Sequence, residues 1–243
     1  MNGTYDYTDF GELIDLIALF DPLMRAISLI LRVLAIRREI WEQRCSQSIS
    51  ICDSSGRNGE LIGHCCDLLD EFDRWDQDAK EYWQMMFENR TQPTILGEAQ
   101  GSQSHYDTET ACTIILLRSS RLILLLSLAD HFHWIFDYDV ADGLWNGCLA
   151  QLEHDMESTI SDMLRCVPYA LGDLDAEGRA ISTASDGSGA LVIFRSIWMV
   201  ATYGHSTPAQ ALESQRILKR MSESMGIRSA AVVAQTEANG VMF

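Results

Sequence analysis

Proline and glycine are scarce in this chain, which has 4 prolines and 16 glycines among 243 residues. Both residues interrupt regular backbone, so their scarcity, together with abundant leucine, isoleucine, alanine and methionine, favours helices. Hydrophobic residues make up 47% of the sequence, enough to build a sizeable core. We therefore expect an all-α fold over residues 1–243: a single domain of about seven or eight packed helices with a buried central helix.

Basic residues are also in short supply. The 18 lysines and arginines face 35 aspartates and glutamates, which gives a formal net charge of −17. A surface of this charge repels phosphate backbones and anionic lipid, so we expect no direct nucleic-acid partner. The first thirteen residues, MNGTYDYTDFGEL, have no basic segment typical of a signal peptide.

Several motifs that mark cofactors, metals or covalent catalysis are missing. The sequence has no GxGxxG, no phosphate-binding loop and no GxSxG, so we expect no nucleotide cofactor and no serine nucleophile. The seven cysteines form no CxxC pair, which argues against a structural zinc site, and their odd number argues against a disulfide framework. We expect no cofactor, no metal, and a reducing intracellular location, in the cytoplasm or nucleus.

The most apolar stretch, TACTIILLRSSRLILLLSLADHFHW at residues 110–134, carries Arg118 and Arg121 in its middle. Each arginine at the centre of a bilayer costs at least roughly 2.5–3.5 kcal/mol on insertion scales. The uninterrupted apolar runs are also far shorter than the ~18 residues of a membrane span. The sequence therefore predicts a central helix buried on all sides, with no membrane partner.

Helices are predicted along most of the chain from apolar spacing and from capping residues. Asp21-Pro22 and Asp107 are predicted to start helices, Pro168 to stop one, and Thr207–Gln210 with Gly226 to cap the last one. The tail beyond Ala234 is expected to fray. The predicted helices cover residues 10–20, 22–44, 60–89, 107–134, 142–166, 190–204 and 208–225, with loops near 46–59, 90–106 and 172–189.

Two segments of the C-terminal half, residues 166–175 and 189–230, resemble the helical regulatory domain of fungal zinc-cluster transcription factors. The shared features are a Val-Pro-Tyr step, a Gly-rich loop, an apolar helix with a tryptophan and a last amphipathic helix ending in Gly-Ile. Here these features are Val167, Pro168, Tyr169, Gly172, Trp198, Gly226 and Ile227. The six closely spaced cysteines of the family's DNA-binding module are absent from this sequence, and Arg195 with Ser196 interrupts the apolar helix.

Polar side chains inside apolar helices are the candidate functional residues. Arg118, Arg121 and Arg195 lie in such helices, and Asp76 falls on the apolar face of the helix predicted over 60–89. A buried charge must be paired or hydrogen-bonded. Either Asp76 pairs with one of the arginines inside a solid core, or the arginines surround a pocket for an anionic or strongly polar small molecule.

Histidines and aromatic residues complete the candidate site. A histidine beside aromatic rings can act as a general acid or base if it opens into a cavity, but it can equally close a wet helix end. The predicted catalytic residues are Asp76, Arg118, Arg121, His131 and Arg195, and the predicted substrate-binding residues are Trp83, Trp198, Tyr203 and His133. The stretch DEFDRWDQD at 70–78 and the set Asp155, Ser158 and Asp162 are similar to magnesium motifs of class I terpene cyclases, but chance matches are expected among so many acids.

Two functions of different class remain open. The resemblance implies a regulator or ligand- and protein-binding module of fungal secondary metabolism that lacks DNA binding. The alternative is an enzyme on the same scaffold, a cyclase or isomerase of a hydrophobic intermediate that uses an apolar pocket with arginine, aspartate and histidine. The expected partner is a hydrophobic small molecule or a protein, and a homodimer is a further alternative.

Overall fold

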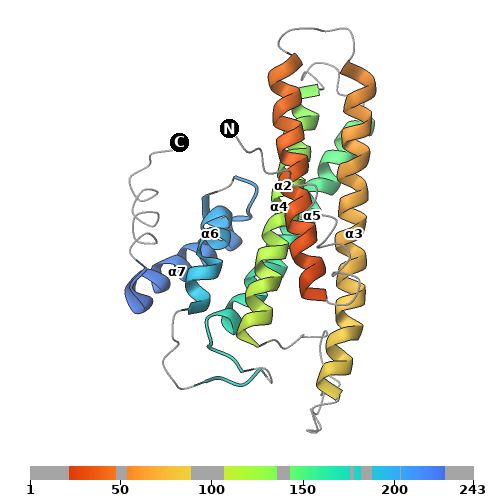
Figure 1. Ribbon diagram of the computed structural model, residues 1–243. Coiled ribbons are helices and arrows are strands. Elements are labelled where there is room, and N and C mark those ends of the chain that lie inside the picture. The colour runs from red at the N-terminus through yellow and green to blue at the C-terminus, as the bar shows by residue number, and fades with distance from the viewer. Residues whose placement is uncertain are drawn as a thin grey trace, which may run out of the picture. The chain divides into compact units, whose positions relative to one another are not determined.

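The computed structural model of the protein describes residues 22–47, 54–88, 107–135, 143–175, 178–181, 188–202 and 204–227. Six helices lie in these ranges: α2 (Pro22–Gln47), α3 (Ser54–Glu88), α4 (Thr108–Ile135), α5 (Gly143–Ala170), α6 (Ser188–Thr202) and α7 (Pro208–Met225) (Figure 1). The described ranges contain no strand, only an isolated bridge between Leu174 and Ala180. The all-α prediction is confirmed for them, whereas the helix predicted over 10–20 lies outside them.

Backbone contacts divide the chain into two compact units. The first unit comprises Met1–Pro93 and Ile123–Asp142 and so contains α2, α3 and the second half of α4. The second unit comprises Thr94–Leu122 and Gly143–Phe243 and contains the first half of α4 with α5, α6 and α7. Each unit is described by itself, and the single-domain organisation stays a prediction.

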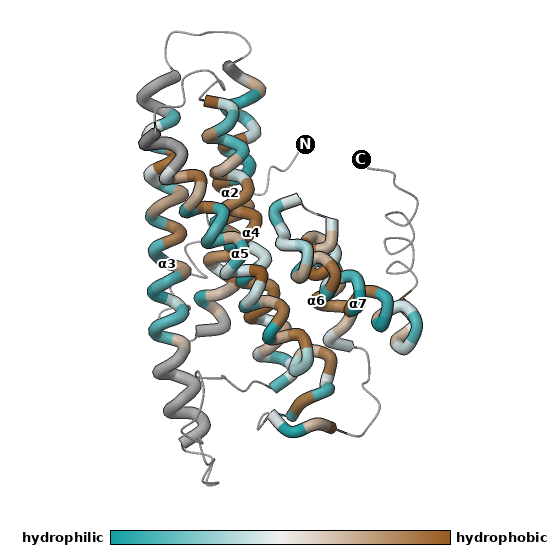
Figure 2. Tube along the Cα trace, turned by 180° about the vertical axis from the view of Figure 1, so that it is seen from behind, coloured by the Kyte–Doolittle hydropathy of each residue, from teal (hydrophilic) through white to brown (hydrophobic). Residues whose placement is uncertain are grey.

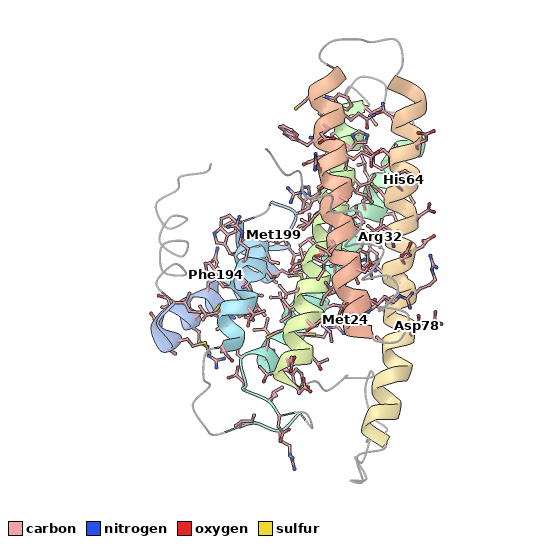
Figure 3. The ribbon with its side chains drawn as sticks, viewed as in Figure 1. Met24, Arg32, His64, Asp78, Phe194 and Met199 are labelled. Carbon is pink, nitrogen blue, oxygen red and sulfur yellow. The ribbon has the colours of Figure 1, made fainter. Side chains whose placement is uncertain are left out.

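In the first unit, α2 and α3 lie side by side as an antiparallel pair (Figure 1). Arg25 pairs with Asp78, and Arg32 donates from Nη2 to Glu71 Oε1 at 2.8 Å. Figure 3 labels Arg32 on α2 and Asp78 on α3. Near the other end, Gln43 Nε2 donates to Asn58 Oδ1 at 2.5 Å. Residues later in α2 contact residues earlier in α3, as an antiparallel pair requires. These polar contacts fix the register of the two helices.

The buried face of α3 recurs every three or four residues, as an amphipathic helix requires. In the sequence, the apolar face of the helix predicted over 60–89 centres near Cys65, Leu69 and Trp83. Cys65 is buried, but Leu69 is only half-buried and the side chain of Trp83 lies outside the described residues. The buried set instead steps from Leu61 in helical spacing. It comprises Leu61, Cys65, Leu68, Phe72, Trp75 and Ala79.

Three helix boundaries differ from the prediction. The loop expected over 46–59 is shortened from both sides, because α2 continues to Gln47 and α3 begins at Ser54. The expected stop at Pro168 is wrong, because α5 continues to Ala170. A proline so close to a helix end deletes one backbone hydrogen bond without breaking the helix, and the chain turns only at Gly172, whose φ is 70°.

The caps predicted at three helix ends are confirmed. Asp107 Oδ1 accepts from the Thr110 N–H at 2.8 Å at the start of α4. Thr207 and Gln210 form a reciprocal capping box on α7, with Pro208 in its first turn. Gly226 ends α7 in the left-handed conformation, and the Ile227 N–H bonds to Met221 O at 3.1 Å.

The second unit packs α6 against α7 and joins α4, α5 and α6 at a close approach. A Cβ built on Gly189 would lie 1.9 Å from the backbone oxygen of Ala170 and 3.3 Å from Cys112 Sγ. Thr108 Oγ1 also donates to Tyr169 O at 3.2 Å. Figure 2 shows the strongly hydrophobic character of α6, which fills this unit's core.

Candidate functional site

Arg118 lies in the first half of α4, and only 13% of its side chain is exposed. Its Nε lies 3.8 Å from Asp162 Oδ2 on α5, and Asp162 Oδ1 accepts from Arg165 Nη2 at 2.7 Å. The chain therefore places a carboxylate beside this arginine, as an apolar environment requires. This partner, Asp162, belongs to the magnesium-like set Asp155, Ser158 and Asp162, and the pairing predicted for Asp76 stays a prediction.

Arg195 lies at the surface, so the prediction that it is folded into an apolar core is wrong. The buried side of α6 carries Ile193, Ile197 and Val200, which follow a three- to four-residue spacing that leaves residue 195 on the other side. The Arg195 guanidinium carbon lies 4.1 Å from the ring centroid of the half-buried Trp198, in a cation–π contact. Figure 3 labels Phe194 and Met199 on the same helix.

The remaining predicted site residues belong to both units. Arg121 on α4 and Asp76 on α3 are both half-buried, and His133 is exposed. Asp76 and both histidines belong to the first unit, whereas the three predicted arginines belong to the second. The side chain of Trp83 and the whole of Tyr203 lie outside the described residues. His133 and Asp137 are four residues apart in the sequence and could share a helix face, but Asp137 lies outside the described residues.

His131 is the predicted site residue with the most distinctive environment. It is 1% exposed, and neither of its ring nitrogens has a hydrogen-bond partner. Its ring stacks on Trp134, with centroids 5.6 Å apart and planes inclined by 22°. Burial lowers the pKa of His131, and the charge of Arg44 lowers it further. The ring is therefore neutral at pH 7, with one N–H to donate and one lone pair to accept.

Arg44, in the last turn of α2, was not predicted as a site residue. Its Nε and Nη2 atoms are buried and have no hydrogen-bond partner. The residue follows Ile40 by four positions, and Ile40 is buried, so helical spacing alone places Arg44 on the inner side of α2. The four-residue spacing from Ile40 could have identified Arg44 in the sequence. The prediction considered only arginines inside longer apolar runs, and Arg44 does not lie in one.

Metal and thiol chemistry find little support among the described residues. No group of three or more His, Cys, Asp or Glu side chains in these ranges could hold a metal ion. Asp162 of the magnesium-like set is bound to arginines, and Asp155 accepts from Gln151 Nε2 at 2.9 Å. Burial raises the pKa of Cys65 and of Cys166 to about 12, so both thiols stay protonated and are poor nucleophiles.

Within the described ranges, α4 is long and apolar enough to cross a membrane by length and composition alone. In its most apolar window, 67% of the residues are buried by the rest of the protein. Three of its serines donate to the carbonyl four residues earlier, including Ser119 to Ile115 O at 2.8 Å and Ser127 to Ile123 O at 2.7 Å. Core helices pass the same length test, and the absence of a membrane partner stays a prediction.

The outer side of α2 carries an apolar stripe that the sequence pattern did not single out. From Ile27 to Trp41 its four residues are spaced by four, three and seven positions, and Arg38 lies between the third and the fourth. The exposed fractions are 42% for Ile27, 40% for Leu31, 52% for Leu34 and 66% for Trp41. We call these four residues the α2 stripe.

Comparison with known proteins gives no assignment: no family model matches the chain, and no curated protein or solved structure matches it.

Proposed function

We propose that this chain is a helical regulator or interaction module, similar to the regulatory domain of fungal zinc-cluster transcription factors but without DNA binding, that acts in secondary metabolism through a protein partner. The seven or eight helices would surround α4 as one domain. The observation that carries the proposal is the α2 stripe. A core that pairs Arg118 with Asp162 while a large apolar strip stays exposed fits an interaction module better than a ligand enclosure.

The stripe has the geometry of a helix–helix seam. Ile27, Leu31, Leu34 and Trp41 recur at heptad spacing, which aligns them along one side of a straight helix. A second helix lying along α2 would cover all four. Fully burying one such side chain contributes roughly 1.5–3 kcal/mol, and tryptophan is a frequent anchor in protein interfaces. The proposed occupant is therefore an amphipathic helix of a partner protein.

The test is affinity capture of the full chain from extract of its native host. We expect the wild-type chain to recover a DNA-binding protein as a stoichiometric partner. The double variant Leu34→Glu with Trp41→Glu should lose at least about tenfold in recovery, because each charge would have to be desolvated in the seam.

Leu212→Glu is the matched control, because Leu212 is an equally exposed leucine, at 50%, on α7. It should recover the partner at the wild-type level, and circular dichroism should show all three proteins folded. Loss of the partner in the control as well, or its retention in the stripe variant, would contradict the role of the stripe. Purification of the wild-type chain as a stable homodimer through α2 would replace the partner protein with a second copy.

The alternative function, a cyclase or isomerase of a hydrophobic intermediate, is supported by one observation: the buried, neutral ring of His131 beside Trp134. A neutral imidazole in an apolar site can remove or return a proton. Metabolite profiles of the native host carrying wild type or His131→Gln would test it. Accumulation of one precursor in the variant supports an enzyme, and identical profiles count against it.

A further inference from the structure

Two buried polar groups of the first unit lack partners at the same end of the α2–α3 pair. Arg44 lies in the last turn of α2, next to Gln43, whose bond to Asn58 holds this end of α2 against the start of α3. His131 lies in the last part of α4, in the same unit. Arg44 lies close enough for its charge to act on the His131 ring.

The bare atoms of Arg44 form one particular edge of the guanidinium group. Nε–H and one N–H of Nη2 point the same way, parallel to each other, and they match the two oxygens of a carboxylate in a bidentate pair. Both nitrogens are buried from solvent and without an acceptor. Burying these donors without an acceptor costs free energy. An anion that accepts hydrogen bonds from both of them would therefore stabilise the folded protein.

His131 supplies a second unmet group and an aromatic boundary. Both ring nitrogens are unpartnered in a residue that is 1% exposed. Trp134 stacks on this ring while 40% of its own surface remains exposed. The nearby turns of α2 and α3 contribute the buried apolar side chains Ile40, Leu61 and Cys65.

The geometry points to a binding site for the carboxylate of a small aromatic acid, held by the Nε–Nη2 edge of Arg44 and by His131, with the body of the ligand against Trp134. The site is independent of the α2 stripe, because its groups face inward and the stripe faces solvent. Arginine supplies the charge-assisted bidentate pair, and the N–H of the neutral imidazole donates one further hydrogen bond to the carboxylate.

The experiment uses the full chain labelled with nitrogen-15, and benzoate as the probe. Benzoate should shift the ring signals of His131 in a saturable way at neutral pH, while the exposed His154 on α5 stays unshifted. Benzamide, which has the same shape without the charge, should produce no saturable shift at the same concentrations. No saturable shift by benzoate up to its solubility limit would overturn the proposal.

Two substitutions of Arg44 distinguish the effect of its paired N–H donors on benzoate binding from the effect of its positive charge. Arg44→Met should weaken benzoate binding by at least about tenfold, and Arg44→Lys, which keeps the charge but lacks the paired donors, should also weaken it several-fold. Arg37→Met removes an exposed arginine of the same helix and should leave binding unchanged. Equal benzoate affinity in wild type and Arg44→Met would overturn the proposal.

Thermal unfolding distinguishes ligand binding by Arg44 from a structural role, because the two predict Tm changes of opposite sign in Arg44→Met. Without ligand, Arg44→Met should raise Tm by about 2 °C or more, because it replaces two buried donors that lack acceptors with an apolar side chain of similar length. Benzoate should raise the Tm of wild type and leave that of the variant unchanged. A lower Tm, or loss of folding, in ligand-free Arg44→Met would show that the guanidinium already has a partner in the folded chain, and the proposal would fall.

Discussion

The arginines of this chain meet their apolar surroundings in three different ways. Arg118 takes a carboxylate from the neighbouring helix, Arg195 turns outward onto the face of Trp198, and Arg44 keeps one buried edge without an acceptor. Sequence spacing predicted that arginines inside apolar helices need compensation, but the kind of compensation depends on which residues a neighbouring helix brings near. For this reason the sequence could place Arg118 near a charge, but it could not name Asp162.

His131 gives a prediction about pH. Burial, followed by the charge of Arg44, lowers its pKa in the folded state below the ordinary value of about 6.5 that it regains on unfolding. The unfolded chain therefore binds more protons below about pH 6.5, and stability contributed by the neutral ring is lost as pH falls through the folded pKa. His131→Gln removes this proton uptake and should show a flatter decline of stability between about pH 7 and pH 5.

Urea unfolding of wild type and variant across that pH range measures the difference. His154→Gln, at an exposed position on α5, serves as the comparison and should follow the wild-type curve. A His131→Gln curve parallel to that of wild type would mean that the histidine does not stay neutral in the folded protein.

At the scale of the helix, apolar periodicity and capping residues predicted the elements well. The starts of α4 and α7 follow Asp107 and Thr207 because those side chains satisfy backbone N–H groups that the helix leaves open. Local signals failed where packing decided the outcome: Pro168 did not stop α5, and the inner side of α3 contains Cys65 but leaves Leu69 only half-buried. The rotation of a helix about its own axis depends on the helix that packs against it, which the sequence of one helix does not contain.

Glycines in two helices should respond to alanine with opposite signs. Gly189→Ala forces a methyl group against the Ala170 carbonyl at the junction of α4, α5 and α6, and should destabilise the protein by about 2–3 kcal/mol. Gly63→Ala, on the exposed side of α3 with nothing within 4 Å of the added carbon, should stabilise it by about 0.5–1 kcal/mol. Urea midpoints of the two variants measure both effects, and a neutral Gly189→Ala would mean that the three helices do not meet as closely as described.

At the scale of the whole molecule, the sequence indicated the fold class but not the function. Scarce helix breakers and abundant apolar residues were enough to predict an all-α protein. Of the predicted site residues, Asp76 and His131 belong to one compact unit and Arg118 and Arg195 to the other. Chain topology decides which of these side chains come together, and a list of polar residues in apolar helices contains no information about it, so the single site stays a prediction.

The α2 stripe was missed for a related physical reason. Its residues look like ordinary core positions in the sequence, because helical spacing alone cannot tell which of two apolar sides a helix buries. Ala26, Leu29 and Val33 form the inner side of α2, and the side chains of Ile27, Leu31 and Leu34 remain outside. The neighbour α3 packs along α2 and leaves the second side exposed.

Site-specific photocrosslinking tests the central claim, that the α2 stripe receives a helix of a partner protein. A photoreactive amino acid at position 34, in cells of the native host, should give crosslinks to one amphipathic helical segment of another protein, identified by mass spectrometry. The same group at position 212 on α7 should not reach that segment. The proposed function is contradicted if position 34 gives no crosslink, or only crosslinks that position 212 gives as well. Either result would mean that α2 does not bind a partner protein.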